Sequence, residues 1–382
     1  MTPPPTSHDR FQTWLFNDAL PLWATTGHEG PLGTAEHLTL NATPAAAPFK
    51  RMRVQARQIY VFAQATLLGW PQGRERAQQG YAFILAHGQR PGGGWVRTLA
   101  PAGTPALDTT LDLYDQAFVL LALAWQARLT NTAEPIDLAR ATLATIDAQM
   151  THPQGGYHNE IPLKPGPRQQ NPHMHLLEAL LALYETSNDP AFLTRAATLV
   201  HLFQTRFFNP ATNTLGEFFA EDWSTPANHI EPGHQFEWVA LLDQYATLSG
   251  TTPAPEIHPL YNAARTHGTN PETGLVYDAV ATNGTPIRRS HRLWPQTEAL
   301  KAHHVMARHG RNTTAQADHT TQTILDRYLS NCPPGTWTDQ LDHQGRPISD
   351  KIPTSSLYHL MTAFAAFPKP NPSPSPSGRE PG

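Results

Sequence analysis

The chain has 382 residues, of which 39% are apolar and 15% are charged, with a formal net charge of −4. Such a composition excludes a highly charged disordered chain and argues against a non-specific nucleic-acid binder, and no apolar run reaches the ~18 residues of a membrane-spanning helix. The first residues lack the basic and apolar regions of a signal peptide, so we expect a cytoplasmic protein. A single cysteine, Cys332, rules out an internal disulfide and a cysteine-rich metal site.

Apolar residues recur with helical spacing in about twelve segments. In chain order, we place helices near residues 10–23, 50–69, 72–87, 109–129, 134–150, 171–187, 189–205, 233–250, 255–267, 290–310, 312–329 and 355–366. No segment is typical of an interdomain linker. We therefore expect one domain over residues 10–367, between a disordered N-terminus (1–9) and a disordered tail rich in proline and serine (368–382).

Three connections between helix pairs repeat one spacing, from a large residue to a turn that contains glycine and proline. They run from Trp95 to Pro105, from Val276 to Pro286 and from Trp337 to Pro347. Each predicts a short β-hairpin. Helical hairpins repeated in this way bury their apolar faces on one another, and they predict an all-α (α/α)6 barrel with short β-hairpins in the connecting loops. An open α-solenoid is the alternative.

Polar and aromatic side chains are concentrated on every second predicted helix, which favours closure around a cavity. His175, His234 and His359 lie near helix ends, and imidazole exchanges protons near neutral pH. Residues three or four apart share a helix face, so His175 lies beside Glu178 and His234 lies beside Glu237. His173 and His175 point apart and form a poor chelate, so we expect no metal site.

Each of these side chains could instead have a purely structural role, as a helix cap or a packed core group. For Arg57, the structural alternative is a salt bridge to a neighbouring helix. Their convergence on one cavity would favour function. Tyr114 is predicted to bind or to pack. Trp95, Trp238 and Trp294 would then offer flat apolar surfaces of the kind on which sugar rings stack.

Five sequence words together resemble the N-acylglucosamine 2-epimerase family, which includes mannose isomerases, cellobiose 2-epimerases and related aldose–ketose isomerases. The words are Val54-Gln55-Ala56-Arg57-Gln58, Asn171-Pro172-His173-Met174-His175-Leu176-Leu177-Glu178-Ala179, Glu231-Pro232-Gly233-His234-Gln235-Phe236-Glu237-Trp238, Arg292-Leu293-Trp294-Pro295-Gln296-Thr297-Glu298 and Leu357-Tyr358-His359-Leu360. The resemblance runs from about Phe11 to Phe364 and independently implies an (α/α)6 barrel.

The resemblance also implies roles for individual residues. His234 and His359 match the family's paired acid/base histidines, and Arg57 matches an arginine near the reacting carbonyl oxygen. The positions that match the rest of the pocket are His175, Asn171, Glu237, Trp294 and Glu298. No metal, nicotinamide or other cofactor is expected. One departure is that residues 223–229 hold no arginine, whereas some aldose–ketose isomerases of the family carry an arginine-rich loop there, so the substrate is not carried over.

The chemistry expected of such a site starts with ring opening of a free aldose. A base then removes the C2 proton, and a cation stabilises the resulting cis-enediolate. Return of the proton to C1 gives a ketose, and return to the opposite face of C2 gives the 2-epimer. We expect His359 to act at the C2 proton and His234 to assist ring opening or to be the second acid/base group, with Arg57 as the cation.

Mannose–fructose isomerisation is the favoured activity, because no extra elements for a disaccharide are apparent. The alternatives are N-acylglucosamine 2-epimerisation and isomerisation of mannose 6-phosphate, for which Lys164, Arg168, Arg288 and Arg289 would supply loop cations. More distant alternatives are a glycoside hydrolase or lyase that uses Glu237 and Glu298, and a non-catalytic sugar-binding scaffold. The expected partner is a small-molecule sugar, not a nucleic acid or a membrane, and a homodimer is left open.

Overall fold

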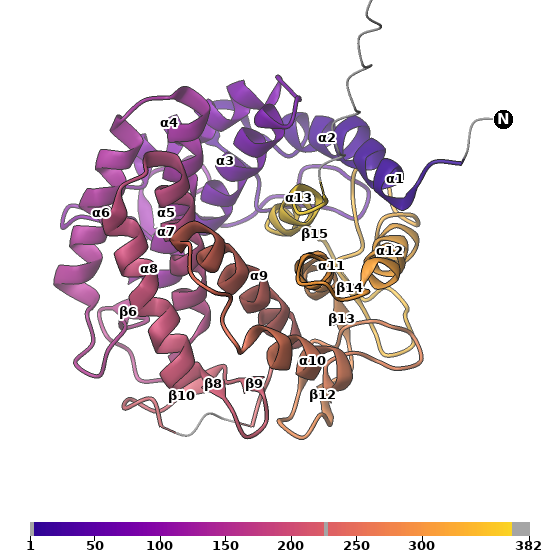
Figure 1. Ribbon diagram of the computed structural model, residues 1–382. Helices are drawn as coiled ribbons and strands as arrows, with labels where there is room; N and C mark the ends of the chain where they lie inside the picture. Colours follow the sequence, from indigo (N-terminus) through magenta and orange to yellow (C-terminus); the bar gives the residue numbers. More distant parts are fainter. Residues whose placement is uncertain (1–3, 225–227, 369–382) are drawn as a thin grey trace, which may run out of the picture.

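The computed structural model describes residues 4–224 and 228–368, and helices dominate them. Within this part of the chain, six helices form an inner ring (Figure 1). They are α3 (Met52–Leu67), α5 (Leu113–Thr130), α7 (Asn171–Ser187), α9 (Pro232–Ser249), α11 (Leu293–Arg308) and α13 (Ser356–Ala365). Each inner helix contacts the next one, and α13 contacts α3 again, so the ring is closed. This closure excludes the open solenoid.

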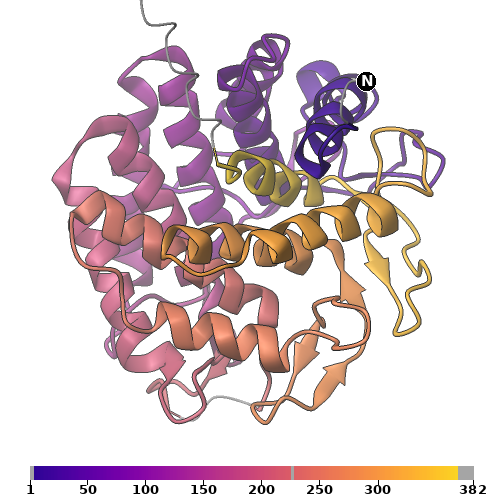
Figure 2. The ribbon, with the colours of Figure 1, turned by 45° about the vertical axis from the view of Figure 1, so that its right-hand side comes forward.

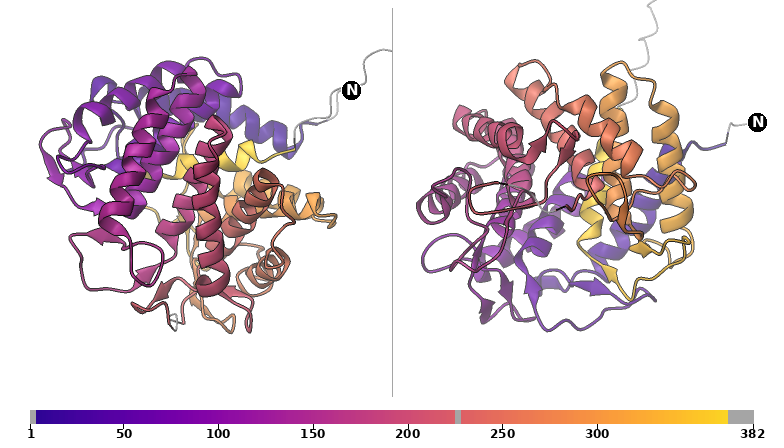
Figure 3. Two further views of the ribbon diagram at one scale, coloured as in Figure 1. Left: turned by 60° about the vertical axis from the view of Figure 1, so that its left-hand side comes forward. Right: turned by 90° about the horizontal axis from the view of Figure 1, so that it is seen from below.

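The helices between them form an outer layer, in which each packs against the inner helix that precedes it in the chain (Figures 1 and 3). They are α4 (Gly73–His87), α6 (Glu134–Met150), α8 (Pro190–Leu202), α10 (Ile257–His267) and α12 (Thr314–Thr323). Short π-helical or 3-10 segments extend or join helices at η1 (Trp14–Ala19), η2 (Gly30–Leu32), η3 (Phe203–Phe207) and η4 (Ile324–Tyr328). The mostly helical class expected from the sequence is therefore confirmed.

The N-terminal helices α1 (Ser7–Thr13) and α2 (Leu20–Thr25) complete the outer layer beside α12 and α13. The expected disorder up to residue 9 is wrong from Ser7 onward. The Thr6 hydroxyl accepts from the Asp9 N–H and the Asp9 carboxylate accepts from the Thr6 N–H, which is a capping box that fixes the first turn. The tail expected at 368–382 lies outside the described residues from position 369.

The two layers differ in sequence because their surroundings differ. Most residues of helix α5 from Leu113 to Leu129 are buried, because this helix has neighbours on most sides. The outer helix α10 buries only a stripe of residues, including Ile257, Leu260 and Ala264. Every helix in the described part is too short or too polar to cross a lipid bilayer. The cytoplasmic location stays a prediction.

Short antiparallel strands join the connections at the end where the inner helices begin (Figures 2 and 3). The pairs are β1 (His37–Leu38) with β15 (Ile352–Pro353), β5 (Leu111–Asp112) with β6 (Glu160–Ile161), β7 (Arg168–Gln169) with β10 (Phe218–Phe219), β8 (Phe208–Asn209) with β9 (Thr214–Leu215) and β13 (His291–Arg292) with β14 (Gln340–Leu341). A further strand, β2 (Lys50–Arg51), pairs with β3 (Thr98–Leu99). Most of these pairs link different connections, so the loops at this end brace one another.

The three repeated connections are turns of one kind. Strand β3 pairs with β4 (Ala106–Asp108), β11 (Ala279–Val280) pairs with β12 (Pro286–Arg288), and an isolated bridge joins Leu341 to Pro347. The glycine in each turn has a positive φ, which is +88° at Gly103, +84° at Gly284 and +77° at Gly345. Side chains other than glycine rarely adopt this conformation, so the repeated glycine is a requirement of the turn.

Candidate active site

The first turns of the inner helices surround a cavity of about 560 Å³, which we call the histidine cavity. It brings together predicted side chains from all six inner helices. They are Arg57, Tyr114, Asn171, His175, His234, Glu237, Trp294 and His359. Because the positive ends of six helix dipoles point toward this cavity, it favours negative charge that develops inside it.

A carboxylate holds the Nδ1 atom of each cavity histidine. The pairs and their Nδ1-to-oxygen distances are His175–Glu178 at 3.0 Å, His234–Glu217 at 2.9 Å and His359–Glu298 at 2.9 Å. An ionised carboxylate only accepts hydrogen bonds, so each Nδ1 carries a proton and each Nε2 is left for a substrate. The arrangement sets both the ring orientation and the tautomer.

His234 is tuned to be an acid. Burial disfavours its charged form, but the carboxylates of Glu217 and Glu231 outweigh burial and raise the pKa of His234 to about 9. A second layer supports Glu217, because its Oε2 accepts from the Gln170 amide at 2.9 Å. The imidazolium of His234 is therefore the main form at neutral pH.

His359 is tuned to be a base. Burial is the largest influence and lowers the pKa of His359 to about 4, with the positive charges of Arg57 and Lys301 acting in the same direction against the Glu298 carboxylate. At neutral pH the ring is neutral and its Nε2 lone pair is available. Burial also lowers the pKa of the third histidine, His175.

Arg57 has no ion-pair partner among the residues that the structure describes, and its Nε has no hydrogen-bond partner there. Its guanidinium donates to the Tyr114 hydroxyl at 2.7 Å and lies 4.0 Å from the centre of the Phe118 ring. Aromatic faces stabilise a cation without neutralising it. The alternative of a structural salt bridge to a neighbouring helix is therefore wrong, and Arg57 is free to meet an oxyanion.

Trp294 is the one predicted tryptophan that lines the cavity. Its ring centre lies 4.9 Å from that of His234 and 5.6 Å from that of His359. A Cβ at Gly233 would come within 2.5 Å of the Trp294 ring, so the glycine of this sequence word makes room for the indole.

Trp95 and Trp238 do not reach the cavity, so the prediction that sugars stack on them is wrong. Trp95 is 1% exposed and Trp238 is 0% exposed. The Trp95 indole donates to the Thr142 hydroxyl. Trp238 follows the cavity residue Glu237 directly, and neighbours on a helix point in different directions. Its indole donates instead to the side-chain oxygen Oε1 of Gln170 at 2.8 Å, so it supports the layer behind His234.

The two predicted carboxyl groups have different environments. Glu298 is 0% exposed, lies behind His359 and does not line the cavity, which corrects its assignment to substrate binding. Glu237 lines the cavity, and neither of its oxygens has a hydrogen-bond partner in the described part of the chain. Burial, with the carboxylates of Glu298 and Glu178, raises the pKa of Glu237 well above its usual range. Because Glu298 is buried behind His359, Glu298 and Glu237 do not lie on either side of a glycosidic bond, as the two carboxyl groups of a glycoside hydrolase must.

The loop cations proposed to hold a phosphate do not line the histidine cavity. Arg168 is 4% exposed, and its guanidinium donates to main-chain oxygens and lies 3.4 Å from the centre of the Trp223 ring. Lys164 pairs with Glu160 beside a neighbouring cavity of about 790 Å³. Arg288 and Arg289 are exposed on and beside strand β12. Within the arginine-free segment 223–229, residues 225–227 lie outside the described residues.

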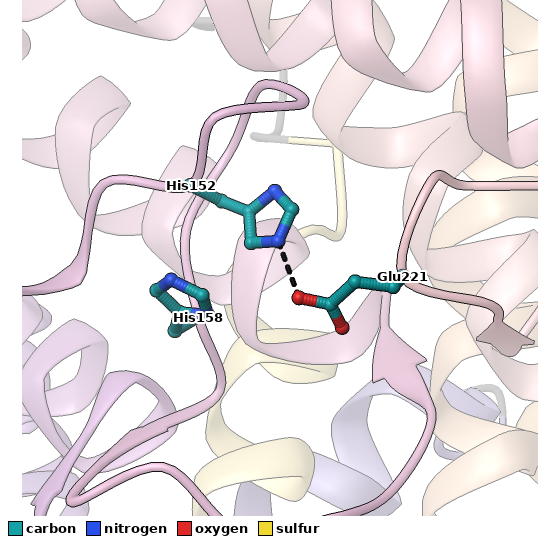
Figure 4. A group of neighbouring side chains, drawn as sticks. All are labelled: His152, His158 and Glu221. Atoms are coloured by element: carbon teal, nitrogen blue, oxygen red, sulfur yellow. Dashed lines mark hydrogen bonds and ion pairs between the residues drawn. The ribbon is translucent and has the colours of Figure 1, made fainter.

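A further histidine cluster lies outside the histidine cavity (Figure 4). His152 Nε2 is 2.6 Å from the Glu221 carboxylate, and His158 lies beside this pair. The Gln154 N–H donates to His152 Nδ1, so the proton of the neutral ring is on Nε2, which donates to Glu221. A metal would need the lone pair at Nε2. The pair is therefore a hydrogen-bonded clip between two loops, and the absence of a catalytic metal stays a prediction.

Comparisons with known proteins agree on one family and one fold. Residues 33–363 match the model of the N-acylglucosamine 2-epimerase family. A mannose-6-phosphate isomerase of Rhizobium meliloti (strain 1021) is 32% identical and covers 92% of this chain and 94% of its own length. A D-mannose isomerase of Thermobifida fusca is 27% identical over 76% of each chain. The solved cellobiose 2-epimerase of Bacillus thermoamylovorans B4167 has a TM-score of 0.84 at 19% identity, over 94% of this chain and 99% of that one.

Proposed function

Because the chain belongs to the N-acylglucosamine 2-epimerase family and is a sugar isomerase or epimerase, we propose that it interconverts mannose and fructose in the histidine cavity. The observation that supports this most directly is the opposite tuning of two histidines around one space. His234 is poised to give a proton and His359 to take one. Aldose–ketose isomerisation needs both functions.

The proposed reaction begins with the closed sugar ring. The His234 imidazolium protonates the ring oxygen as the C1 hydroxyl passes its proton to water, which breaks the bond from C1 to the ring oxygen and gives the aldehyde. His359 Nε2 then takes the C2 proton, and the electron pair moves to the carbonyl oxygen to form the cis-enediolate. The Arg57 guanidinium and the inner-helix N-termini stabilise the oxyanion. The proton on His359 exchanges with solvent before His359 protonates C1. His234, now neutral, takes the proton of the C2 hydroxyl and passes it to the C1 oxygen, which gives the ketose.

A second candidate is 2-epimerisation, which the closeness of both histidines to the Trp294 ring supports. A planar enediolate beside that indole would lie near both His359 and His234. Donation to C2 by His234 would then invert the configuration. The ratio of ketose to epimer among the products measures which donor is faster.

Two cations that line the histidine cavity are held in ion pairs, which supports a neutral sugar, whereas Lys351 at its rim pairs, among the described residues, only with the exposed Asp350. Arg51 pairs with Glu36, and Arg292 pairs with Glu231 and Asp278, so neither cation is free for a phosphate. The name of the Rhizobium relative nevertheless makes mannose 6-phosphate the necessary comparison.

The test is incubation of the purified chain in deuterium oxide with mannose, fructose, glucose, N-acetylmannosamine or mannose 6-phosphate. Products are separated, and deuterium at C1 and C2 is located by NMR. We expect mannose and fructose to interconvert and to acquire solvent deuterium at the reacting carbons. If no sugar of this panel exchanges its C2 hydrogen, the proposal fails. Faster turnover of mannose 6-phosphate than of mannose would replace the substrate and keep the chemistry.

A further inference from the structure

Lys301 connects to the proposed catalytic base through a single carboxylate. It follows Glu298 by one turn of α11, and its Nζ lies 2.5 Å from Glu298 Oε2. The other oxygen, Oε1, accepts from His359 Nδ1 at 2.9 Å. The Glu298 side chain is 0% exposed and that of Lys301 is 11% exposed. One buried carboxylate thus bridges an ammonium group and an imidazole.

In the described part of the chain, no lysine or arginine forms an ion pair with the carboxylates of the other two histidine–carboxylate pairs, although the charge of Lys301 also acts on Glu178. Glu217 accepts its additional hydrogen bonds from the Gln170 amide and the Glu231 N–H. Glu178 accepts one from the Tyr358 hydroxyl. Neutral donors are therefore enough to complete the hydrogen bonds of Glu217 and Glu178. Lys301 is not needed merely as a donor to Glu298, so its positive charge is the property that requires an explanation.

Lys301 is also placed between two cavities. A second space of about 530 Å³ opens at the opposite end of the inner ring, and Lys301 and Glu178 are among its lining residues. The histidine cavity lies on the other side of the layer that contains Glu298 and His359. Burying a lone ammonium is costly, and three carboxyl groups, those of Glu298, Glu237 and Glu178, favour its charged form.

We propose that Lys301 is a positioning residue for the reaction, whose ammonium offsets the charge of the Glu298 carboxylate that it shares with His359 and so holds His359 in its neutral form with Nε2 free. The inference rests on the proposed function for its catalytic meaning. The other titratable or charged groups that face the same layer or the cavity above it are Arg57 on α3, His175 and Glu178 on α7, His234 and Glu237 on α9, Tyr358 on α13 and Asp339 in the preceding loop.

The first experiment measures the pH profile of C2-hydrogen exchange for Lys301→Met in the full chain. Loss of a nearby positive charge favours the imidazolium, so the pKa of His359 rises. Because the base must be neutral, the acidic limb of kcat/KM should move to higher pH by about one unit or more, with activity retained above it. Lys301→Arg keeps the charge and should leave the limb close to that of the wild type.

Arg308→Met is the matched control. Arg308 lies on the same helix and beside the same far cavity, but it pairs with Asp243, away from His359. Its loss should leave the acidic limb in place. Should Lys301→Met fail to fold, Lys301→Gln tests the same charge with a side chain that still forms hydrogen bonds. A folded Met or Gln variant whose limb matches the wild type would overturn the inference, whatever happens to its maximal rate.

An NMR titration separates this inference from the proposed function. The imidazole signal of His359 is assigned by its absence in His359→Asn, and its pKa is measured in wild type and in Lys301→Met without any sugar. We expect a higher pKa in the variant, and an unchanged value would overturn the inference. A wild type that exchanges no sugar hydrogen would defeat the proposed function alone, because the titration still reports on Lys301.

Discussion

The two sides of the histidine cavity contain the same pair of groups in opposite states. His234 meets Glu217 and His359 meets Glu298, each at 2.9 Å through Nδ1. The pKa of His234 nevertheless rises to about 9, whereas that of His359 falls to about 4. A carboxylate partner therefore does not by itself decide whether a histidine is an acid or a base.

The difference lies in the next charges. His234 has a second carboxylate nearby, that of Glu231, in addition to Glu217. His359 has two cations nearby, Arg57 and Lys301, which offset the effect of Glu298. Burial pushes both histidines toward the neutral form, and the surrounding charges then separate them. Each prediction below changes one side of this comparison and leaves the other intact.

The largest effect is expected for His359→Asn. Asn keeps polarity and much of the bulk at the cavity wall but cannot act as a base, so exchange of the C2 hydrogen with solvent deuterium should fall by about 10²–10⁴-fold. Circular dichroism checks that the variant folds. Wild-type exchange rates in the folded variant would place the chemistry elsewhere and return Glu237 and Glu298 to consideration.

His234→Asn should be the next most severe change. Turnover falls by about 10²-fold because ring opening loses its acid, but slow C2 exchange persists on molecules that open in solution. The wild type should lose activity as pH rises through about 9, where His234 gives up its proton. This basic limb should disappear in the variant. Complete loss of exchange in His234→Asn, with a stable fold, would exchange the roles of the two histidines.

Glu217→Gln should act only through His234. Without the carboxylate, the pKa of His234 falls, so its protonated form is lost at lower pH and the basic limb moves down by about 1–3 units. Activity near pH 5.5 should change little. Glu221→Gln is the matched control, because Glu221 pairs with His152 outside the cavity. Equal shifts in the two variants would show that the effect is not specific to the pair.

The smallest effect is expected for Trp238→Phe. The change removes the hydrogen bond from the indole to Gln170, which in turn supports Glu217. The free energy of unfolding should fall by about 1 kcal/mol, as measured by urea denaturation, and the basic limb should move less than in Glu217→Gln. A large rise in KM would mean that Trp238 contacts sugar after all, which its burial argues against.

The sequence predicted the helices well because periodicity and caps are local signals. It also predicted most of the cavity side chains, because they lie near the N-terminal ends of the inner-ring helices. It predicted partners only where spacing along one helix reveals them, as for Glu178 beside His175. The carboxylate of His234 comes from the loop between β9 and β10, and that of His359 comes from a different helix. No spacing along a single helix could indicate either pair.

Errors in the prediction follow the same physical rule. Trp238 was assigned to the cavity because it lies four residues after His234 and so shares a helix face with it, but its indole points into the layer behind His234 and donates to Gln170. The helix start at Ser7 was missed because the capping pair, Thr6 and Asp9, was not recognised among the early prolines. Neither error involves the fold, since both concern the direction or the boundary of a single element.

The first and last helices are in contact, so the chain could begin at another point of the closed ring without changing which helices are neighbours. The His8 ring lies 4.6 Å from that of Phe367, centre to centre, and Ser7 donates to Asp318 on α12. The two ends of the described helical body therefore meet in space. A short peptide could splice them, and a circular permutant with new ends between α5 and α6, at the end of the ring opposite the histidine cavity, would keep every helix beside its present neighbours.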